Sequence, residues 1–390
     1  MRQEVLDSFL QVFGAEAGLP RVFFAPGRVN LIGEHIDYNG GLVMPCALNI
    51  GTYGAIRKRD DNTIKLISGN FDSPLISFSL DELVYDKEHG WGNYPKGVVA
   101  LLKEKGCNVG GFDMYVWGNL PSGAGLSSSA SLNTLVALAV DEVFELGISP
   151  VERAKLCQYA ERFHGVNCGI MDPFASTMGE ENHAILLNCD TLEYEQIPLN
   201  LGDYQIIIAN TNYRRGLADS KYNERRAECE QALADLQKVC DIKELCELSP
   251  KVFEAYKDKI ECDTARKRAE HAVYENFRTK EAARVMKAGK LEELLPLMRE
   301  SHLSLRDLYE VTGKALDTLT AAAFSYGKKN PGTVIGTRMT GAGFGGCTVN
   351  IVHKDAVEDF VASVGKLYYA GTETEASFYV AEVGGGAREL

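Results

Sequence analysis

The stretch LPSGAGLSSSASL, at residues 120–132, decides the fold, because a glycine- and serine-rich loop joins a predicted strand to a predicted helix there. The preceding FDMYVWGNL is rich in aromatic residues and favours a strand. In the following segment, residues 130–147, apolar side chains recur at the helical period, and Gly147 is the predicted stop. Gly123 and Gly125 permit unusual backbone conformations, and the amides at a helix start face its positive end. The stretch therefore predicts an anion site, most simply for a polyphosphate.

Ser127, Ser128 and Ser129 add hydroxyls that can donate to phosphate or bind Mg²⁺. A single serine before a helix is more often a cap, but three serines after Gly-x-Gly favour phosphate binding. The loop is not a Walker A motif, because GxxxxGK[ST] does not occur in the chain. A dinucleotide-binding fingerprint is disfavoured, because the third glycine is missing and its candidate acid, Asp141, lies on the same predicted helix.

A literal GxGxxG occurs at Gly341, Gly343 and Gly346. The segment after it, CTVNIV, alternates like a strand, so no helix start is predicted to face a pyrophosphate there. Small residues between two strands fit a close backbone approach, either to a packed surface or to a ligand. The sequence leaves these two interpretations equally open.

The composition is that of an ordinary globular protein of 390 residues, long enough for two domains. A formal net charge of -13 argues against a nucleic-acid partner. Ten cysteines are scattered without CxxC or Cys/His metal spacing, which predicts reduced thiols and a cytoplasmic location. The first residues predict an amphipathic helix, not a signal peptide, and no segment predicts a membrane span.

Along the chain, RVFFAPGRVNLIG at residues 21–33 predicts a strand that Pro26 and Gly27 turn into a loop. Ser149, Pro150 and Glu152 predict a capped helix that continues to about residue 165. Residues 216–327 are charge-rich and helical in pattern. The change from strand-like segments to this pattern predicts a domain boundary near residue 200. The predicted domains are residues 1–200 and 201–390, and the final GGGAREL predicts a loose tail.

Four motifs together resemble the galactokinase family of the GHMP sugar kinases. They are GRVNLIGEHIDYNGG, PSGAGLSSSAS, CGIMDPF and RMTGAGFGGC, in the order and approximate spacing of that family. The resemblance implies an α+β fold of two domains, a ribosomal-protein-like N-terminal domain and a ferredoxin-like C-terminal domain with added helices. It also implies an active site between them and ATP-dependent phosphorylation of the C1 hydroxyl of α-D-galactose.

The resemblance implies a catalytic pair, Asp172 and Arg28. Asp172 would accept or orient the proton of the sugar hydroxyl, and Arg28 would hold Asp172 ionised and stabilise the transferring phosphoryl group. Without the other motifs, Asp172 before Pro173 reads as a turn or cap residue. Pro173 departs from the glutamine common in the family, so the orientation beside Asp172 is where the resemblance is weakest.

For ATP and Mg²⁺, the resemblance implies the loop Gly123, Ala124, Gly125, Leu126 and Ser127–Ser129 as the phosphate site. Glu161 matches the family's acidic Mg²⁺ ligand and would act with Ser128 or Ser129, a choice that the sequence leaves open. A solvated glutamate on a helix face is the alternative. Trp91 is a candidate surface for stacking adenine, and a core position is the alternative.

For the sugar, the resemblance implies that Glu34 and His35 reach the O6 side and that Asp37 binds the O3 and O4 hydroxyls. Gly169 and Tyr222 would complete the pocket. Fixed donors and acceptors reject the wrong epimer by leaving polar groups unpaired.

Three other functions remain for comparison. One is a GHMP kinase for a related sugar such as N-acetylgalactosamine or a galacturonate-like sugar. Another is a sensor that binds galactose and ATP without turnover, disfavoured because it has no need of Arg28, Asp172, Glu161 and the serine loop together. A nicotinamide-dependent oxidoreductase is disfavoured by the contexts of the glycines. No obligate protein partner is evident from the sequence.

Overall fold

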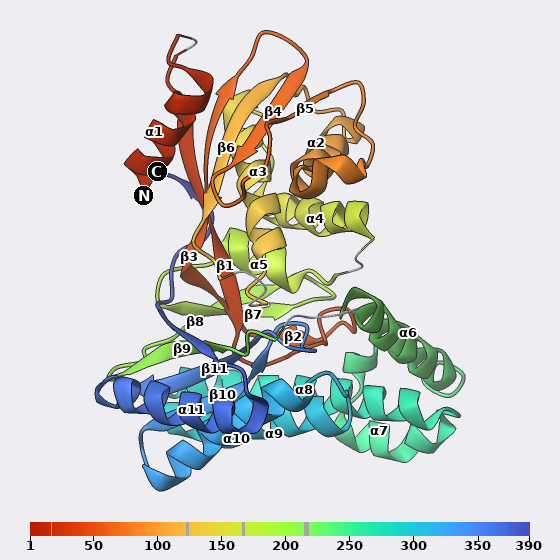
Figure 1. Cartoon of the computed structure of the whole chain (residues 1–390). Coiled ribbons are helices and arrows are strands. Elements are labelled where there is room, and N and C mark those ends of the chain that lie inside the picture. Colours follow the sequence, from red (N-terminus) through yellow and green to blue (C-terminus); the bar gives the residue numbers. More distant parts are fainter. Residues whose placement is uncertain (17, 122–124, 166–167, 214–217) are drawn as a thin grey trace.

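The computed structural model describes residues 1–16, 18–121, 125–165, 168–213 and 218–390. It consists of two parts stacked along one long axis, each with its own sheet and helices (Figure 1). The α+β class predicted from the sequence is confirmed. No helix among the described residues is long and apolar enough to cross a membrane.

The N-terminal part is a six-stranded sheet in the order β13-β1-β3-β6-β4-β5. All neighbouring pairs are antiparallel except β4 and β6. The main core lies between this sheet and helices α2, α3 and α4, while α1 packs on the opposite face (Figure 1). The strands are β1 (Arg21–Asn30), β3 (Pro45–Lys58), β4 (Thr63–Ser68), β5 (Ile76–Ser79), β6 (Phe112–Gly118) and β13 (Arg388–Glu389), and the helices are α1 (Arg2–Phe13), α2 (Asn93–Glu104), α3 (Ser128–Phe144), α4 (Pro150–Glu161) and α5 (Met171–Met178).

The C-terminal part is a four-stranded antiparallel sheet in the order β10-β11-β9-β12. Ile206 and Ile208 of β9 enter the core that contains residues of α8 and α9, whereas Ile207 and Ala209 enter the core beneath α10 and α11. Both faces of β9 are therefore buried, which explains its unbroken apolar sequence. The strands are β9 (Tyr204–Asn210), β10 (Val334–Thr340), β11 (Cys347–His353) and β12 (Ser377–Ala381), and the helices are α6 (Ala218–Leu236), α7 (Pro250–Tyr256), α8 (Asp263–Lys287), α9 (Leu294–Asp307), α10 (Lys314–Lys329) and α11 (Val357–Thr372).

A third sheet of β2 (Leu42–Val43), β7 (His183–Asn188) and β8 (Tyr194–Pro198) lies between the two parts (Figure 1). β8 ends at Pro198 and the second sheet begins with β9 at Tyr204, close to the predicted boundary. Short 3-10 helices span Lys87–Gly92, Arg162–His164, Leu245–Glu247, Lys257–Lys259, Leu291–Glu293 and Lys354–Ala356.

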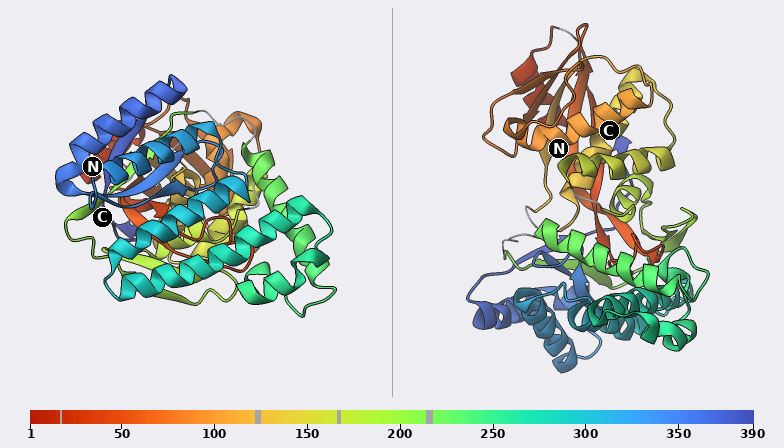
Figure 2. Two further views of the ribbon diagram at one scale, coloured as in Figure 1. Left: turned by 90° about the horizontal axis from the view of Figure 1, so that it is seen from below. Right: turned by 90° about the vertical axis from the view of Figure 1, so that its right-hand side faces the viewer.

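The C-terminus is not a loose tail, so that prediction was wrong. β13 adds to the edge of the N-terminal sheet by pairing with β1, and the amide of Leu390 donates to the carbonyl of Val22 at 2.9 Å. The two chain ends lie side by side (Figures 1 and 2), where Arg2 Nε donates to the Leu390 carbonyl at 2.9 Å. The chain thus returns to its first sheet after completing the second.

Two other local predictions needed correction. The strand at residues 21–33 does not end at Pro26, because a register shift between Pro26 and Arg28 lets β1 continue to Asn30. The helix after the phosphate loop, α3, ends at Phe144 with Glu145 as its left-handed C-cap, so it stops before Gly147, the predicted end. The capped start of α4 is confirmed, since Ser149 accepts from the amide of Glu152 and Pro150 begins the helix.

Candidate active site

A cavity of about 700 Å³ lies between the two parts and contains side chains from both. It collects most of the residues that the motifs single out, although they come from segments far apart in the chain. Those that line it are Arg28, Glu34, His35, Asp37, Gly125, Leu126, Ser127, Ser128, Ser129, Glu161, Gly169, Asp172 and Tyr222. Gly123 and Ala124 lie outside the described residues.

An ion pair between Arg28 and Asp172 lines the cavity. The bulge in β1 precedes Arg28, and α5 carries Asp172 in its first turn. The guanidinium donates to both carboxylate oxygens, from Nε to Oδ1 at 2.7 Å and from Nη2 to Oδ2 at 2.8 Å. Burial by itself lowers the pKa of Arg28, but the carboxylates of Asp172, Glu34 and Asp37 outweigh it and raise that pKa. The pair is therefore a fixed charge pair at the cavity wall.

Pro173 fits this arrangement without a lost hydrogen bond. It is the third residue of α5, within the first turn, where backbone amides have no acceptor inside the helix. Its carbonyl accepts from Thr177 Oγ1 at 2.7 Å. The missing amide of Pro173 thus leaves the helical geometry around Asp172 intact.

Ser127 departs from the simple cap that a serine before a helix suggests. It stands at the N-cap position of α3 in the left-handed conformation, and it makes no side-chain cap hydrogen bond. Its hydroxyl donates to Asp172 instead. Ser128 then begins α3, and its side chain is exposed. The start of this helix and its hydroxyls therefore face the cavity, as an anion site requires.

Glu161, at the end of α4, is buried and accepts a hydrogen bond from Asn133 Nδ2 at 2.9 Å. It lines the same cavity as Ser128 and Ser129. The described residues contain no group of three or more His, Cys, Asp or Glu side chains that could hold a metal. One carboxylate and a hydroxyl are nevertheless a donor set that suits Mg²⁺, which keeps several waters and phosphate oxygens.

Asp37 and Gly169 meet in the lining of the cavity. A Cβ at residue 169 would lie 1.8 Å from Asp37 Oδ2, so only glycine fits there. Burial raises the pKa of Asp37 to about 7, helped by Asp172 and Glu34 and opposed by the Met171 amide and Arg28. Asp37 is thus an acceptor that gains a proton near neutral pH.

His35 has both ring nitrogens engaged within the protein. Nδ1 lies 2.7 Å from Tyr38 Oη and Nε2 lies 3.2 Å from the Ala342 carbonyl. A carbonyl can only accept, so Nε2 carries the proton and Nδ1 accepts from the tyrosine. Burial lowers the pKa of His35 to about 3, so the ring is neutral. The Tyr222 ring, from α6, lies 5.6 Å away between ring centres.

The glycine-rich turn between β10 and β11 faces the cavity and is also tightly packed. Gly341 and Ala342 line the cavity. A Cβ at Gly341 would lie 2.7 Å from the Gly125 carbonyl, and one at Gly343 would lie 2.1 Å from the Val311 carbonyl. The close packing is therefore confirmed for this turn, whereas contact with a ligand stays a prediction.

Trp91 is not among the described residues that line the cavity. It lies in the 3-10 helix Lys87–Gly92 and packs against the N-terminal core, the alternative placement. The motifs also assigned no role to Asn210, Asn212 or Arg338. Asn210 and Asn212 line the cavity. Asn210 is the last residue of β9 and Asn212 lies just beyond it, a position that can be recognised only once the strand order is known.

Comparisons with known proteins agree with this geometry. The chain matches the models of the galactokinase galactose-binding signature at residues 7–58, the GHMP kinase N-terminal domain at 93–180 and the GHMP kinase C-terminal domain at 280–370. It is 51% identical to the galactokinase of Bacillus subtilis (strain 168), over 100% of this chain and 99% of that protein. It is 52% identical to a galactokinase of Clostridium perfringens (strain SM101 / Type A), over 98% of each.

Among solved structures, the crystal structure of Lactococcus lactis galactokinase complexed with galactose superimposes with a TM-score of 0.95. Sequence identity is 46%, over 100% of this chain and 99% of that one. The fold and the cavity thus define a kinase of the GHMP class, with its two-domain architecture. Because about half of the residues are identical to those of galactokinases over the full length, the chain belongs to the galactokinase family of sugar kinases.

Proposed function

We propose that the chain transfers the γ-phosphoryl group of ATP to the C1 hydroxyl of α-D-galactose, giving galactose 1-phosphate and ADP. The observation that carries the proposal is the bidentate Arg28–Asp172 pair, set in one cavity with the start of α3. A carboxylate for the hydroxyl proton and a cation for the phosphoryl charge are what this transfer needs, because positioning and charge neutralisation dominate its catalysis.

Asp172 is the base or orienting group and Arg28 the charge stabiliser. The guanidinium keeps Asp172 aligned through two hydrogen bonds, and Ser127 gives the carboxylate a third donor. Held in this way, the carboxylate is placed to accept the proton of the C1 hydroxyl. Arg28 also donates to the Gly125 carbonyl at 2.8 Å, which ties the catalytic pair to the phosphate loop.

The loop from Gly123 to Ser129 is proposed to hold the phosphates of ATP at the start of α3. Glu161 and the hydroxyl of Ser128 or Ser129 would hold Mg²⁺, supported by their place in one cavity. When bound, the ion supplies positive charge that offsets the phosphate oxygens. Trp91 is kept as a candidate for stacking on adenine, but its packing against the N-terminal core does not favour that role.

The sugar end of the cavity is proposed to read the galacto configuration. Asp37 would accept from the O3 and O4 hydroxyls, with Gly169 leaving room for that carboxylate, and Tyr222 would flank the ring. Glu34 would accept from the O6 hydroxyl. Because both His35 nitrogens bond within the protein, His35 would contact the sugar only by giving up one of these partners.

The test is ADP release from Mg-ATP with galactose, glucose, N-acetylgalactosamine, galacturonate and arabinose. Turnover largely confined to galactose is expected. Turnover with another sugar would keep the fold and reassign the pocket, and galactose binding without any turnover would favour the sensor. We also propose that the enzyme works in the cytoplasm with small-molecule substrates and no obligate protein partner, a location supported by its ten free cysteines.

A further inference from the structure

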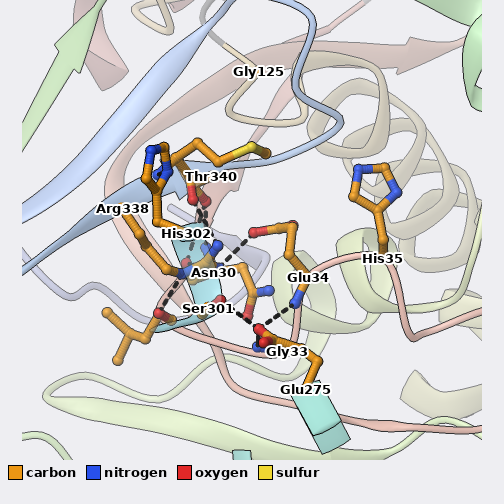
Figure 3. A network of polar contacts seen from close by, with 12 residues as sticks. Asn30, Gly33, Glu34, His35, Gly125, Glu275, Ser301, His302, Arg338 and Thr340 are labelled. Carbon is orange, nitrogen blue, oxygen red and sulfur yellow. Dashed lines mark hydrogen bonds and ion pairs between the residues drawn. The ribbon is translucent and has the colours of Figure 1, made fainter. Parts of the chain in front are cut away.

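Glu34 belongs to the N-terminal part, but the C-terminal part holds it at three points, and Figure 3 shows those made by Glu275 and Arg338. The Glu34 amide donates to Glu275 Oε1 of α8 at 3.4 Å. The Glu34 carbonyl lies 3.1 Å from Nε2 of His271. The side-chain Oε2 lies 2.5 Å from Nη2 of Arg338 on β10.

Arg338 is the least expected of these partners, because its side chain is 0% exposed. It also donates to three backbone carbonyls, those of Leu31 at 2.7 Å, Met339 at 2.6 Å and Asn30 at 2.9 Å. Asn30 and Leu31 end β1 and begin the loop that carries Glu34. The guanidinium of Arg338 therefore holds both this loop and the Glu34 carboxylate.

A buried guanidinium keeps its charge, so it needs an ionised partner. Glu34, 2% exposed, is that partner, and it also lines the cavity. With Oε2 taken by Arg338, the carboxylate has Oε1 left for a ligand, and an ionised oxygen can only accept a hydrogen bond.

We propose that Arg338 is a positioning residue for sugar recognition: it holds Glu34 as a fixed acceptor that selects a sugar with a hydroxyl at C6. The inference rests on the proposed function, because the sugar and the O6 contact come from it. The new element is that a residue of the second domain, which does not itself touch the sugar, sets the discrimination at C6.

Electrostatics around Glu34 support this role. Burial raises the pKa of Glu34, Arg338 and Arg28 oppose the rise, and Asp172 adds to it. The other titratable neighbours are Asp37, which acts by charge, and Glu275 and His271, which contact the Glu34 amide and carbonyl. Loss of Arg338 would therefore push that pKa higher and move the protonation of the acceptor toward neutral pH.

The experiment compares kcat and KM for galactose and 6-deoxygalactose in the unmodified chain and in Arg338→Lys. Lysine keeps the charge but cannot span three carbonyls and a carboxylate. We expect KM for galactose to rise about tenfold or more, with little change in KM for 6-deoxygalactose or ATP, because only the contact to O6 is lost.

Arg268→Lys is the matched control. Arg268 is another buried arginine of the second part, bonded to Glu228, Glu310 and the Leu308 carbonyl, and it does not line the cavity among the described residues. Its replacement should lower the melting temperature without changing the preference for galactose over 6-deoxygalactose. An equal loss with both sugars in Arg338→Lys would overturn the proposal.

If Arg338→Lys does not fold, Glu34→Gln and the double variant Glu34→Gln with Arg338→Met provide the comparison. Neither leaves an unpaired carboxylate in the cavity, and in Glu34→Gln the guanidinium keeps its three backbone carbonyls. In Glu34→Gln, Arg338 can still hold the new side-chain amide, so part of the preference for galactose over 6-deoxygalactose should remain. In the double variant that part should be lost. Equal preferences in the two would refute the role of Arg338. Failure of the proposed function looks different, since the unmodified chain would then not phosphorylate galactose.

Discussion

The arginine–carboxylate pairs show how single residues set the chemistry of the cavity. Arg28 and Arg338 each hold a carboxylate that lines it, Asp172 and Glu34. The motifs place Arg28 and Asp172 as partners, because both belong to stretches with a recognisable pattern. Arg338 lies in such a stretch too, but its contact spans 304 residues, and nothing local shows that its side chain turns toward the first domain.

Replacement of Asp172 by Asn tests the catalytic pair. Asparagine keeps the size but loses the charge that accepts the hydroxyl proton. We expect kcat to fall by at least about a thousandfold, while galactose affinity, measured by calorimetry, stays within several-fold. Turnover near the unmodified level would remove Asp172 from its proposed role.

Asp37 predicts a pH dependence of sugar binding. Its pKa in the folded protein is raised to about 7, so the free site loses its ionised acceptor as the pH falls through that value. Sugar hydroxyls that donate to the carboxylate favour its ionised form, so binding below pH 7 should release a proton.

We therefore expect KM for galactose to rise by up to about tenfold per pH unit below 7. Calorimetry in buffers of different ionisation enthalpy measures the proton release directly. Asp37→Asn should bind weakly and without this dependence, which separates Asp37 from Glu34. A KM that is flat from pH 8 to pH 6 would contradict the assignment.

At the level of elements, strongly periodic segments were predictable and their ends were not. The helix after the phosphate loop, the start of α4 and the strand pattern around residue 340 all follow from local sequence. The interruption expected at Pro26 is absorbed by a bulge. β5, α2 and β8 were not predicted, because their patterns are short or mixed and tertiary packing decides them.

The glycine-rich turn after β10 gives a prediction at this scale. Gly343 has a φ of 77°, and a Cβ there would meet the Val311 carbonyl at 2.1 Å. Gly343→Ala should displace the turn and the Ala342 carbonyl that bonds His35. KM for galactose should rise about tenfold or more, because small displacements are costly at such a site.

Gly332→Ala is the matched control for this turn. Gly332 also has a positive φ, 84°, but a Cβ there has open space. It carries the same backbone strain without the collision, so it should cost stability alone, about 1 kcal/mol. If both variants raise KM equally, the turn does not shape the sugar site.

On the scale of the whole molecule, the cavity exists only where the two parts meet. β1 and its following loop supply Arg28, Glu34 and Asp37, and the β10–β11 turn and α6 close over them. Such a site depends on how the parts are joined. One of the joints is the C-terminal strand, which crosses back from the second part to the edge of the first sheet (Figure 1).

Deletion of residues 388–390 tests that joint. It removes β13, the Leu390 amide bond to Val22, and the ion pair of Glu389 with Arg21 at 2.6 Å. We expect a loss of about 1–3 kcal/mol in the free energy of unfolding, visible as a lower melting temperature. Glu389→Ala removes only the half-exposed ion pair and should cost about 0.2–1 kcal/mol.

Because β13 pairs with β1 at Phe23 and Phe24 and not at Arg28, kcat at a temperature well below melting should change little. A deletion that lowers kcat without lowering the melting temperature would place the C-terminus in the chemistry instead of the scaffold. An unchanged melting temperature would mean that the edge strand contributes nothing to the sheet that carries Arg28.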